Sequence, residues 1–208
     1  MSEHRTEKSA RELFGDGKTA IKTRERLLDR ATDLFYTHGI HAVGLDRILK
    51  DVGVTKTTFY NHFESKDALT CEVLRRRHTW EMEWFLKAVD DISDGQPRLT
   101  LLAIFDVLHK WFTDPEFRGC QFINAAAEFP VATDPVHQEA ANHKFATRKL
   151  LRETAQAAGA PDPEELSDQL MVLFEGAITL RHVAGDNQAA AIARKVAERL
   201  VDQTIGDE

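Results

Sequence analysis

The sequence predicts an all-α protein in which a small N-terminal helix-turn-helix domain precedes a larger helical bundle. From residue 23 onward, apolar side chains recur at helical spacing and no segment alternates as a strand would. Glycine and proline residues divide this pattern into about nine segments. One short segment, residues 55–63, differs from the rest because hydroxyl and basic side chains open it and aromatic residues close it.

The first helix is predicted over about residues 23–38. Its apolar stripe consists of Leu27, Leu28, Ala31, Leu34 and Phe35. Gly39 follows the stripe and can take the left-handed conformation that ends many helices. A second, short helix is predicted over residues 45–52, and Gly53 ends it with the tight turn that two steeply crossing helices require.

The third helix is predicted to begin at Thr55, whose hydroxyl can accept a hydrogen bond from an unpaired amide of the first turn. Phe59 and Phe63 lie four residues apart on one face and should be buried. The outward face then carries Lys56, Thr57, Thr58, Asn61 and His62, with Tyr60 between the two faces. No acidic residue occurs between Val52 and Phe63, whereas an ordinary solvated face usually mixes Glu with Lys.

This outward face predicts a helix that contacts DNA. The next helix begins with Ser65 as its cap, and Lys66 in its first turn is placed for a phosphate contact. We expect the lysines to act mainly on phosphates, and Thr57, Thr58 and Asn61 to read base edges. The predicted DNA contacts are Thr55, Lys56, Thr57, Thr58, Tyr60, Asn61, His62 and Lys66.

One ordered string of residues resembles a known family. It reads Ala31-x-x-Leu34-Phe35-x-x-x-Gly39, then Ile48, then Val52-Gly53-Val54-Thr55-Lys56-Thr57-Thr58-Phe59-Tyr60-Asn61-His62-Phe63-x-Ser65-Lys66-x-x-Leu69. With this string, residues 23–70 resemble the DNA-binding domain of TetR family transcriptional regulators. Two positions depart from the family pattern. Gly44 stands where Thr or Ser often opens the second helix, and Thr57 stands where a smaller residue is common.

Charge is distributed unevenly along the chain, whose net charge is −7. Residues 20–79 hold 11 Lys and Arg against 8 Asp and Glu, whereas residues 80–208 hold 12 against 22. The basic end coincides with the predicted DNA-binding end, and the acidic body would help to orient the approach to DNA. The expected domains are a flexible arm (1–19), the helix-turn-helix domain (20–66) and a ligand-binding and dimerisation domain (67–208).

Composition gives no indication of a membrane protein or a secreted one. No apolar run approaches the ~20 residues of a membrane-spanning helix, and the N-terminus lacks the apolar core of a signal peptide. We therefore expect a cytoplasmic protein. Cys71 and Cys120 are not spaced as metal ligands and are expected to be free, buried thiols. No cofactor and no metal are expected.

The larger domain is predicted to consist of helices throughout. Their approximate ranges are 65–93, 99–112, 119–129, 135–158, 166–183 and 188–204. By resemblance, the last two should pair with their copies in a homodimer, since one helix-turn-helix reads too few base pairs for useful specificity. The same apolar stripes could instead be buried within one chain. The predicted interface residues are Leu170, Phe174, Ala177, Ile178, Ile192, Val196 and Leu200.

The resemblance also implies a cavity for a small, largely apolar effector that releases a repressor from a pseudo-palindromic operator. Residues 118–129 mix small, aromatic and polar side chains, and Asn124 and Glu128 share one face. Those two side chains could equally brace helices or bind Arg148. The predicted lining residues are His109, Trp111, Phe122, Asn124, Glu128, Phe145, Phe174 and His182. Effector binding is expected to move the long helix that begins after Ser65.

Three other classes of function fit the sequence less well. A helical adaptor that binds proteins without DNA affinity is one, and the salt dependence of DNA binding would separate it from a regulator. A catalytic set drawn from Asp106, His109, Cys120 and Glu128 lacks a glycine-rich elbow, a phosphate loop or a metal-binding spacing. The nine histidines are scattered along the chain, which disfavours a metal sensor.

Overall fold

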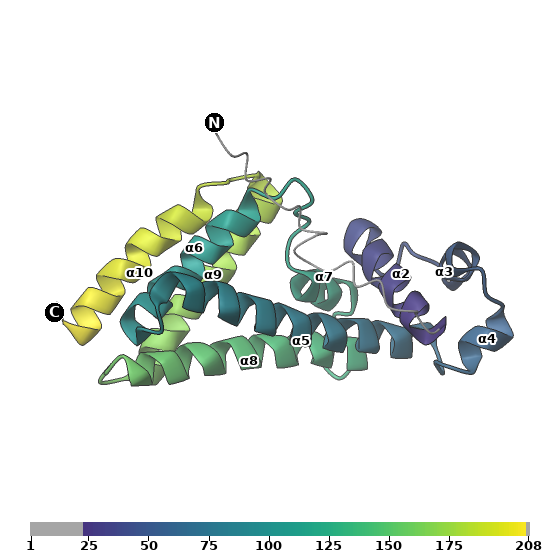
Figure 1. Cartoon of the computed structure of the whole chain (residues 1–208), viewed down its shortest axis with the longest axis horizontal. Coiled ribbons are helices and arrows are strands. Elements are labelled where there is room, and N and C mark those ends of the chain that lie inside the picture. The colour runs from purple at the N-terminus through teal and green to yellow at the C-terminus, as the bar shows by residue number, and fades with distance from the viewer. Residues whose placement is uncertain (1–22, 207–208) are drawn as a thin grey trace, which may run out of the picture.

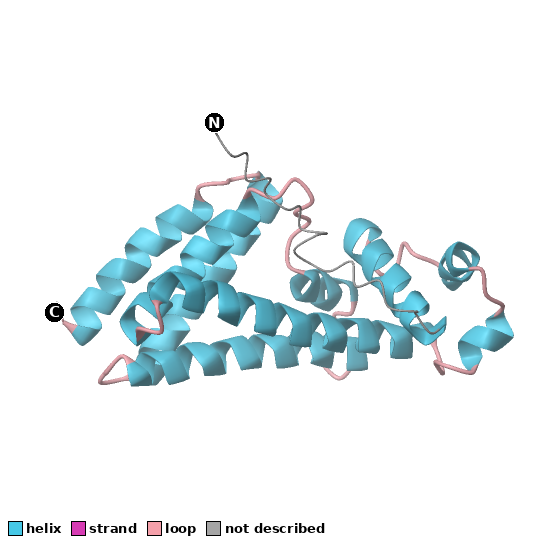
Figure 2. Cartoon of the chain, in the orientation of Figure 1, coloured by secondary structure: helices cyan, strands magenta, loops and turns pink. Residues whose placement is uncertain are grey.

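The computed structural model describes residues 23–206 and places nine helices and no strand among them (Figures 1 and 2). The helices are α2 (Thr23–His38), α3 (Leu45–Val52), α4 (Lys56–Tyr60), α5 (Lys66–Ser93), α6 (Pro97–Phe112), α7 (Gln121–Glu128), α8 (Pro135–Ala157), α9 (Pro163–Ala184) and α10 (Ala189–Ile205). The predicted all-α class is confirmed. None of the helices in this range is long and apolar enough to cross a membrane. The arm predicted over residues 1–19 lies outside the described residues.

Helices α2, α3 and α4 form a small unit at one end of the molecule (Figure 1). Leu27, Ala31, Ile48 and Phe59 have no exposed surface there, so the apolar stripes of the sequence meet in a dry core. Gly53 ends α3 with φ at 75°, a left-handed conformation that costs glycine little. The turn that follows positions α4 across the end of the unit.

Helix α5 connects the small unit to the body of the molecule. Ser65 caps it, since the Ser65 hydroxyl accepts a hydrogen bond from the Ala68 amide at 3.0 Å. Leu69 and Val73, in its first two turns, are fully buried near the small unit. Its remaining length lies beside α8 and under α6 (Figure 1). A single unbroken helix therefore contributes to the cores of both parts.

In the body, α6 is the central helix, packed against α5, α8 and α10. Half of its 16 residues are buried, among them Leu101, Phe105 and Phe112 with no exposed surface. Ion pairs tie its first turn and its middle to α10: Arg98 contacts Asp202 at 2.6 Å, and Asp106 contacts Arg194 at 3.0 Å. Helix α9 completes the body by packing on α8 and α10.

Helix α7 and the loop before it contact the small unit independently of α5. The Glu128 carboxylate accepts hydrogen bonds from the backbone amides of Ile40, at 2.8 Å, and His41, at 2.5 Å. The His41 ring stacks on Phe129 with 4.6 Å between ring centroids. These contacts hold the loop between α2 and α3 against the body.

Candidate nucleic-acid interface and internal cavity

The outward face of α4 carries most of the side chains that the sequence predicted to contact DNA. The Thr55 hydroxyl accepts a hydrogen bond from the Thr58 amide at 3.1 Å, which caps the helix as expected. Phe59 is fully buried and stacks on Phe63, so it fixes the rotation of this short helix. The exposed side chains are Thr55, Lys56, Thr57, Tyr60, Asn61 and His62, and Thr58 is half-buried.

Lys56 forms an exposed ion pair across the turn. Its ammonium lies 2.9 Å from the carboxylate of Asp46 in the first turn of α3. The hydrogen bond to Asp46 raises the pKa of Lys56, so the side chain stays charged at any physiological pH. Because both partners are exposed to solvent, the pair is weak, and a phosphate group can replace Asp46 at little cost.

The phosphate contact predicted for Lys66 is not supported by the position of its side chain. The ammonium is turned inward, where it donates a hydrogen bond to the Ile40 carbonyl at 2.6 Å and lies 5.7 Å from the centre of the Phe35 ring. Burial lowers the pKa of Lys66, and the carboxylates of Asp67 and Glu128 oppose that shift. Lys66 therefore holds the loop between α2 and α3 from within.

Two exposed basic residues of α3 were not predicted from the sequence as candidate DNA contacts. Arg47 and Lys50 are exposed and lie three residues apart on one face of this helix. One guanidinium nitrogen of Arg47 lies 3.0 Å from Nε2 of His38. Gly44 precedes the helix and offers no side-chain cap, so the first amides of α3 have no side-chain partner at that position. Basic residues at i, i+3 spacing were the signal that could have identified this face.

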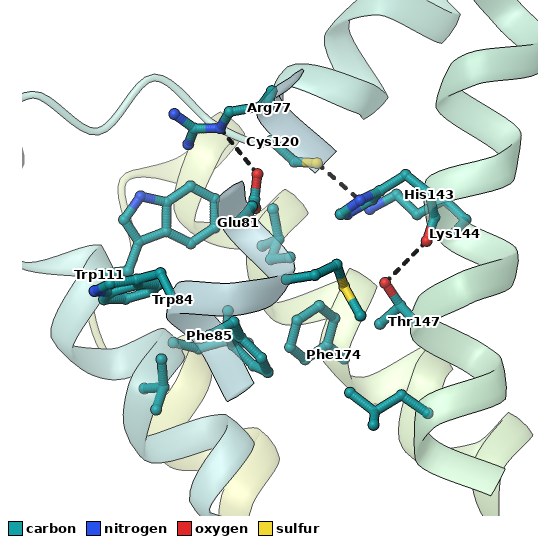
Figure 3. A pocket seen from close by; sticks show the side chains of 15 residues that line it. Arg77, Glu81, Trp84, Phe85, Trp111, Cys120, His143, Lys144, Thr147 and Phe174 are labelled. Carbon is teal, nitrogen blue, oxygen red and sulfur yellow. Dashed lines mark hydrogen bonds and ion pairs between the residues drawn. The ribbon is translucent and has the colours of Figure 1, made fainter. Parts of the chain in front are cut away.

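A cavity lies in the body between α5, α6, α8 and α9 (Figure 3). The empty space in and around it, open solvent at its mouth included, is about 640 Å³. Its walls are mainly apolar and aromatic. The aromatic side chains are Trp84, Phe85, Trp111 and Phe174, of which Trp111 and Phe174 were predicted from the sequence. Phe122 does not line the cavity itself but stacks on His143, which does, with 3.6 Å between ring centroids.

Asn124 and Glu128, the polar pair predicted for this cavity, do not line it. The Asn124 amide donates to the Arg118 carbonyl at 3.1 Å, within the loop that precedes α7. Glu128 binds the loop amides of Ile40 and His41 instead. Glu128 therefore braces the small unit, and Asn124 binds the loop before α7.

Three further predicted lining residues also lie elsewhere. Phe145 is 65 % exposed on the outer surface of α8. His182 is exposed and packs against Gly119, where a side chain would collide with its ring. His109 is half-buried on α6 outside the lining, although its Nδ1 is buried without a partner in the described structure. A single sequence gives the period of a helix but not which side of it a cavity adjoins.

One side of the cavity carries charged residues, and these residues are paired. Arg77 and Glu81, on α5, lie 3.0 Å apart. Lys144, on α8, is 2.8 Å from Glu175 and 3.4 Å from the Cys120 sulfur. Arg77, Glu81 and Lys144 were not predicted from the sequence, because one charge per helical turn on an amphipathic helix looks like a solvated face.

Burial and neighbouring charges set the protonation of this charged side. Burial raises the pKa of the Cys120 thiol more than Lys144 lowers it, so the sulfur is present as a thiol near neutral pH. Burial would also raise the pKa of Glu81, but Arg77 and other cations hold it below its usual range. Burial lowers the pKa of His143 to about 4, which keeps this ring neutral. Its Nδ1 lies 3.0 Å from Nδ1 of His78.

The face of α9 that was predicted to form a dimer interface is turned inward. Leu170, Phe174, Ala177 and Ile178 are buried within the protomer, and Phe174 and Ile178 line the cavity. The opposite face of α9 is exposed, and it carries apolar side chains that the prediction missed. On α10, Ile192 and Val196 are exposed as predicted, and Leu200 is half-buried. We call Val172, Leu180, Val183, Ile192 and Val196 the exposed apolar stripe.

The residues considered for catalysis each take part in a different structural contact. Asp106 is paired with Arg194, and Glu128 is bound to loop amides. Within the described part of the chain, no group of three or more His, Cys, Asp or Glu side chains is arranged to hold a metal ion. Both cysteines are free and buried.

The chain matches two family models. One is described as bacterial regulatory proteins, tetR family, and matches residues 27–73; the other, tetracyclin repressor-like, C-terminal domain, matches residues 95–197. The HTH-type transcriptional regulator YjdC of Escherichia coli K12 is 23% identical over 86% of this chain and 93% of its own. The HTH-type transcriptional activator FasR of Mycolicibacterium smegmatis is 33% identical over 60% of this chain and 53% of its own. The solved structure of sav143, a TetR-type regulator of Streptomyces avermitilis, aligns with a TM-score of 0.78 at 30% identity, covering 88% of this chain and 98% of that one.

Proposed function

The chain belongs to the TetR family of bacterial regulatory proteins and is a DNA-binding transcriptional regulator, and we propose that it is a repressor released by a small molecule. Residues 20–66 would read DNA, and residues 67–208 would bind the effector and a second copy of the chain. The observation that carries the proposal is the continuity of α5, which begins in the small unit and forms one wall of the cavity.

The proposed DNA surface is the outward face of α4 together with α3. Exposed hydroxyl, amide and imidazole groups on α4 suit base edges and phosphates, and Tyr60, 56 % exposed, can place its hydroxyl on a phosphate. Lys56, Arg47 and Lys50 supply positive charge beside them. We propose base contacts from Thr57, Thr58 and Asn61, and no phosphate contact from the Lys66 side chain.

The proposed dimer interface is the exposed apolar stripe of α9 and α10. Val172 is 73 % exposed and Val183 is 79 % exposed. Apolar side chains that gather on an exposed surface in this way often mark a site where another protein binds. Gly176 lies between Val172 and Val183 with open space around it, so another helix could approach closely. A two-fold pair of such surfaces would present two copies of α4 to successive half-sites of a pseudo-palindromic operator.

The effector would act on two connections between the cavity and the small unit. Arg77, Glu81 and Trp84 of α5 line the cavity, and Leu69 and Val73 of the same helix belong to the core near the small unit. Cys120 also lines the cavity, one residue before α7, and α7 ends in the Glu128 brace. A ligand that pushes α5 and α7 apart would therefore alter the spacing of the two DNA-reading units.

Repression is proposed from the common behaviour of the family, although one relative, FasR, is named as an activator. The first test is fluorescence anisotropy of the purified protein with DNA tiles from the region beside its own gene, at two salt concentrations. We expect tight binding to one pseudo-palindromic tile that weakens steeply with salt. The Tyr60→Ala variant should lose this binding, and Phe145→Ala, an exposed aromatic change far from α4, should retain it.

Weak and equal binding on all tiles would place the operator elsewhere. Absence of DNA binding even at low salt would favour a protein-binding adaptor instead. A transcription assay from the same tile then decides between repressor and activator.

The dimer is tested by sedimentation of Val183→Glu. A charge placed in the stripe occurs twice in a symmetric interface, so the dimer should dissociate while the helical signal persists. Glu153→Gln, an exposed change on α8, is the control. If Val183→Glu sediments as the wild-type dimer, then the exposed apolar stripe is not the interface.

A further inference from the structure

A second cavity adjoins the first and extends it along α5. It lies between α5, α6 and α8 near the turn that joins α5 to α6, and the empty space in and around it, open solvent included, is about 390 Å³. Its walls are almost entirely apolar. Val89, Leu101 and Ile104 line this cavity but not the first, and no charged residue is among its lining residues. Phe85 and Phe174 line both cavities. The two spaces are therefore compartments of one elongated site.

The partition between the compartments consists of the four residues that line both cavities, Phe85, Thr147, Leu150 and Phe174, and two of them form a pair of aromatic rings. Phe85 and Phe174 meet edge to face with 5.9 Å between ring centroids. A change in the side-chain rotamer of either ring would join the two spaces, whereas the backbone of α5 and α9 need not move. A slender apolar chain could pass at this point, but a wide polycyclic ring system could not pass without spreading the helices.

The charged side of the first cavity carries no excess of either sign. Arg77 is balanced by Glu81, and Lys144 is balanced by Glu175. Beside them, Cys120 is an uncharged thiol and His143 an uncharged ring. A ligand carboxylate would bring a buried negative charge beside two carboxylates, and a ligand ammonium would bring a positive charge beside two cations. Neither charge would find an unpaired partner.

We infer that the site binds a neutral, single-chain amphiphile. Its uncharged hydrogen-bonding head group, such as a hydroxyl, carbonyl or amide, would lie among Arg77, Cys120 and Lys144. Its unbranched apolar tail would pass between Phe85 and Phe174 into the second cavity. This inference rests on the proposed effector site and adds the chemical class of the effector to it.

The inference predicts a dependence of affinity on tail length. Trp84 and Trp111 line the first cavity, so their fluorescence can report binding of straight-chain alcohols directly, without DNA. From hexanol to dodecanol, below the solubility limit of each alcohol, affinity should rise roughly fourfold per methylene group until the second cavity is full. Affinity that does not change with tail length would overturn the inference.

Filling the second cavity should shorten the preferred tail. In Val89→Phe a ring occupies that space, so the long alcohols should lose their advantage while hexanol binds as before. Ile92→Phe makes a similar change at an exposed position of the same helix and is the matched control. Val89→Leu fills the space less and tests the same point if the larger ring disturbs folding. A wild-type length profile in both Val89 variants would contradict the placement of the tail.

The head group is tested by Glu175→Gln, which keeps the shape of the side chain and leaves Lys144 without its counter-ion. Wild-type protein should bind dodecanol at least tenfold more tightly than dodecanoate or dodecylammonium. The variant should gain at least tenfold for dodecanoate and change little for dodecanol. Equal binding of the alcohol and the carboxylate to wild-type protein would overturn the assignment of a neutral head.

These measurements separate the ligand class from the proposed function. If the alcohols bind with the expected length profile but do not release operator DNA, the ligand class holds and the effector mechanism fails. If another molecule releases the DNA and the alcohols do not bind, the regulator proposal holds and the amphiphile inference fails.

Discussion

The two ends of this molecule differ in how completely side chains fill the interior. In the small unit, side chains from α2, α3 and α4 pack around Phe59, which has no exposed surface. In the body, α5, α6, α8 and α9 leave two adjoining cavities around Phe85 and Phe174. A surface that must match DNA requires a fixed shape, whereas a site for a small molecule requires space that packing would otherwise remove.

The contrast predicts that equal changes in volume will have unequal effects in the two parts. Removing a ring from the small unit creates a void in a core that has few other contacts. Adding or removing volume around the cavities changes ligand preference first, because space is already present there. The variants below test that difference, beginning with the largest expected effect.

Phe59→Ala should destabilise the small unit by about 3–5 kcal/mol, the usual cost of deleting a buried ring. Phe59 also stacks on Phe63 at 5.6 Å, so the change removes the anchor of α4 as well. Circular dichroism during urea unfolding should show early loss of part of the helical signal, and DNA binding should disappear. Phe145→Ala, at a position 65 % exposed, should change stability by less than about 0.5 kcal/mol.

A uniform loss of stability across the whole chain in Phe59→Ala would mean that the two parts unfold as one unit. In that case the two parts would differ in packing but would not have separate free energies of unfolding. Hydrogen exchange of the α6 amides distinguishes the two results, because α6 lies entirely in the body.

The body should be the more sensitive part when the pH falls. Burial lowers the pKa of His143 to about 4, against Glu81, which raises it. In the unfolded chain His143 binds a proton near its ordinary pKa of 6.5, so folding must exclude that proton at lower pH. The resulting stability is fully present above pH 6.5 and is lost progressively as the pH falls toward 4. The loss should reach about 3 kcal/mol at most.

His143→Gln should flatten this part of the stability profile between pH 6.5 and 4, even if the variant is less stable at pH 8. Urea unfolding at several pH values measures the profile. His62→Gln, on the exposed face of α4, is the matched control and should leave the slope unchanged. A wild-type slope in the His143 variant would show that other groups cause the acid sensitivity.

The helices were predictable from the sequence because their signals are local. Helical periodicity, the glycine turn at Gly53 and the hydroxyl caps at Thr55 and Ser65 each depend on a few neighbouring residues. The exposed face of α4 followed for the same reason, since burial of Phe59 fixes which residues point outward. The inward turn of Lys66 did not follow, because its acceptor is a carbonyl distant in the sequence.

The cavity was harder to predict because its walls come from four helices. Trp111 and Phe174 were identified, but Arg77, Glu81 and Lys144 resembled ordinary surface charges. The dimer prediction named a face of α9 that is buried within the protomer, because both faces carry apolar residues and the spacing of residues alone does not rank them. Only the packing of α9 against α8 and α10 shows that Val172 and Val183 remain outside.

The brace between the two parts is tested by Glu128→Ala. This change leaves the amides of Ile40 and His41 without their carboxylate partner and should cost about 2 kcal/mol. Those two amides should exchange hydrogen faster, and the effector should have a weaker influence on DNA affinity. Glu128→Gln keeps one acceptor oxygen and should fall between wild type and Glu128→Ala. Unchanged exchange at both positions would show that the Glu128 carboxylate does not hold this loop.

The smallest expected effect is at the exposed surface of the small unit, where Lys56 is paired only with Asp46. Lys56→Ala should leave stability unchanged, because an exposed pair contributes little. It should weaken DNA binding a few-fold and to a similar degree on specific and non-specific tiles, since a phosphate contact carries no sequence information. The slope of log affinity against log salt should fall by about 0.9, the value for one lost phosphate contact.

Asn61→Ala is the contrasting change on the same face. If Asn61 reads a base edge, its loss should weaken specific binding by about 1–3 kcal/mol, and the salt slope should stay the same. Exposed residues of one short helix would then divide into those that set the strength of binding and those that set its specificity. If both variants lower the salt slope alike, then this face of α4 binds only the DNA backbone, and base recognition must come from α3, where Arg47 and Lys50 are exposed.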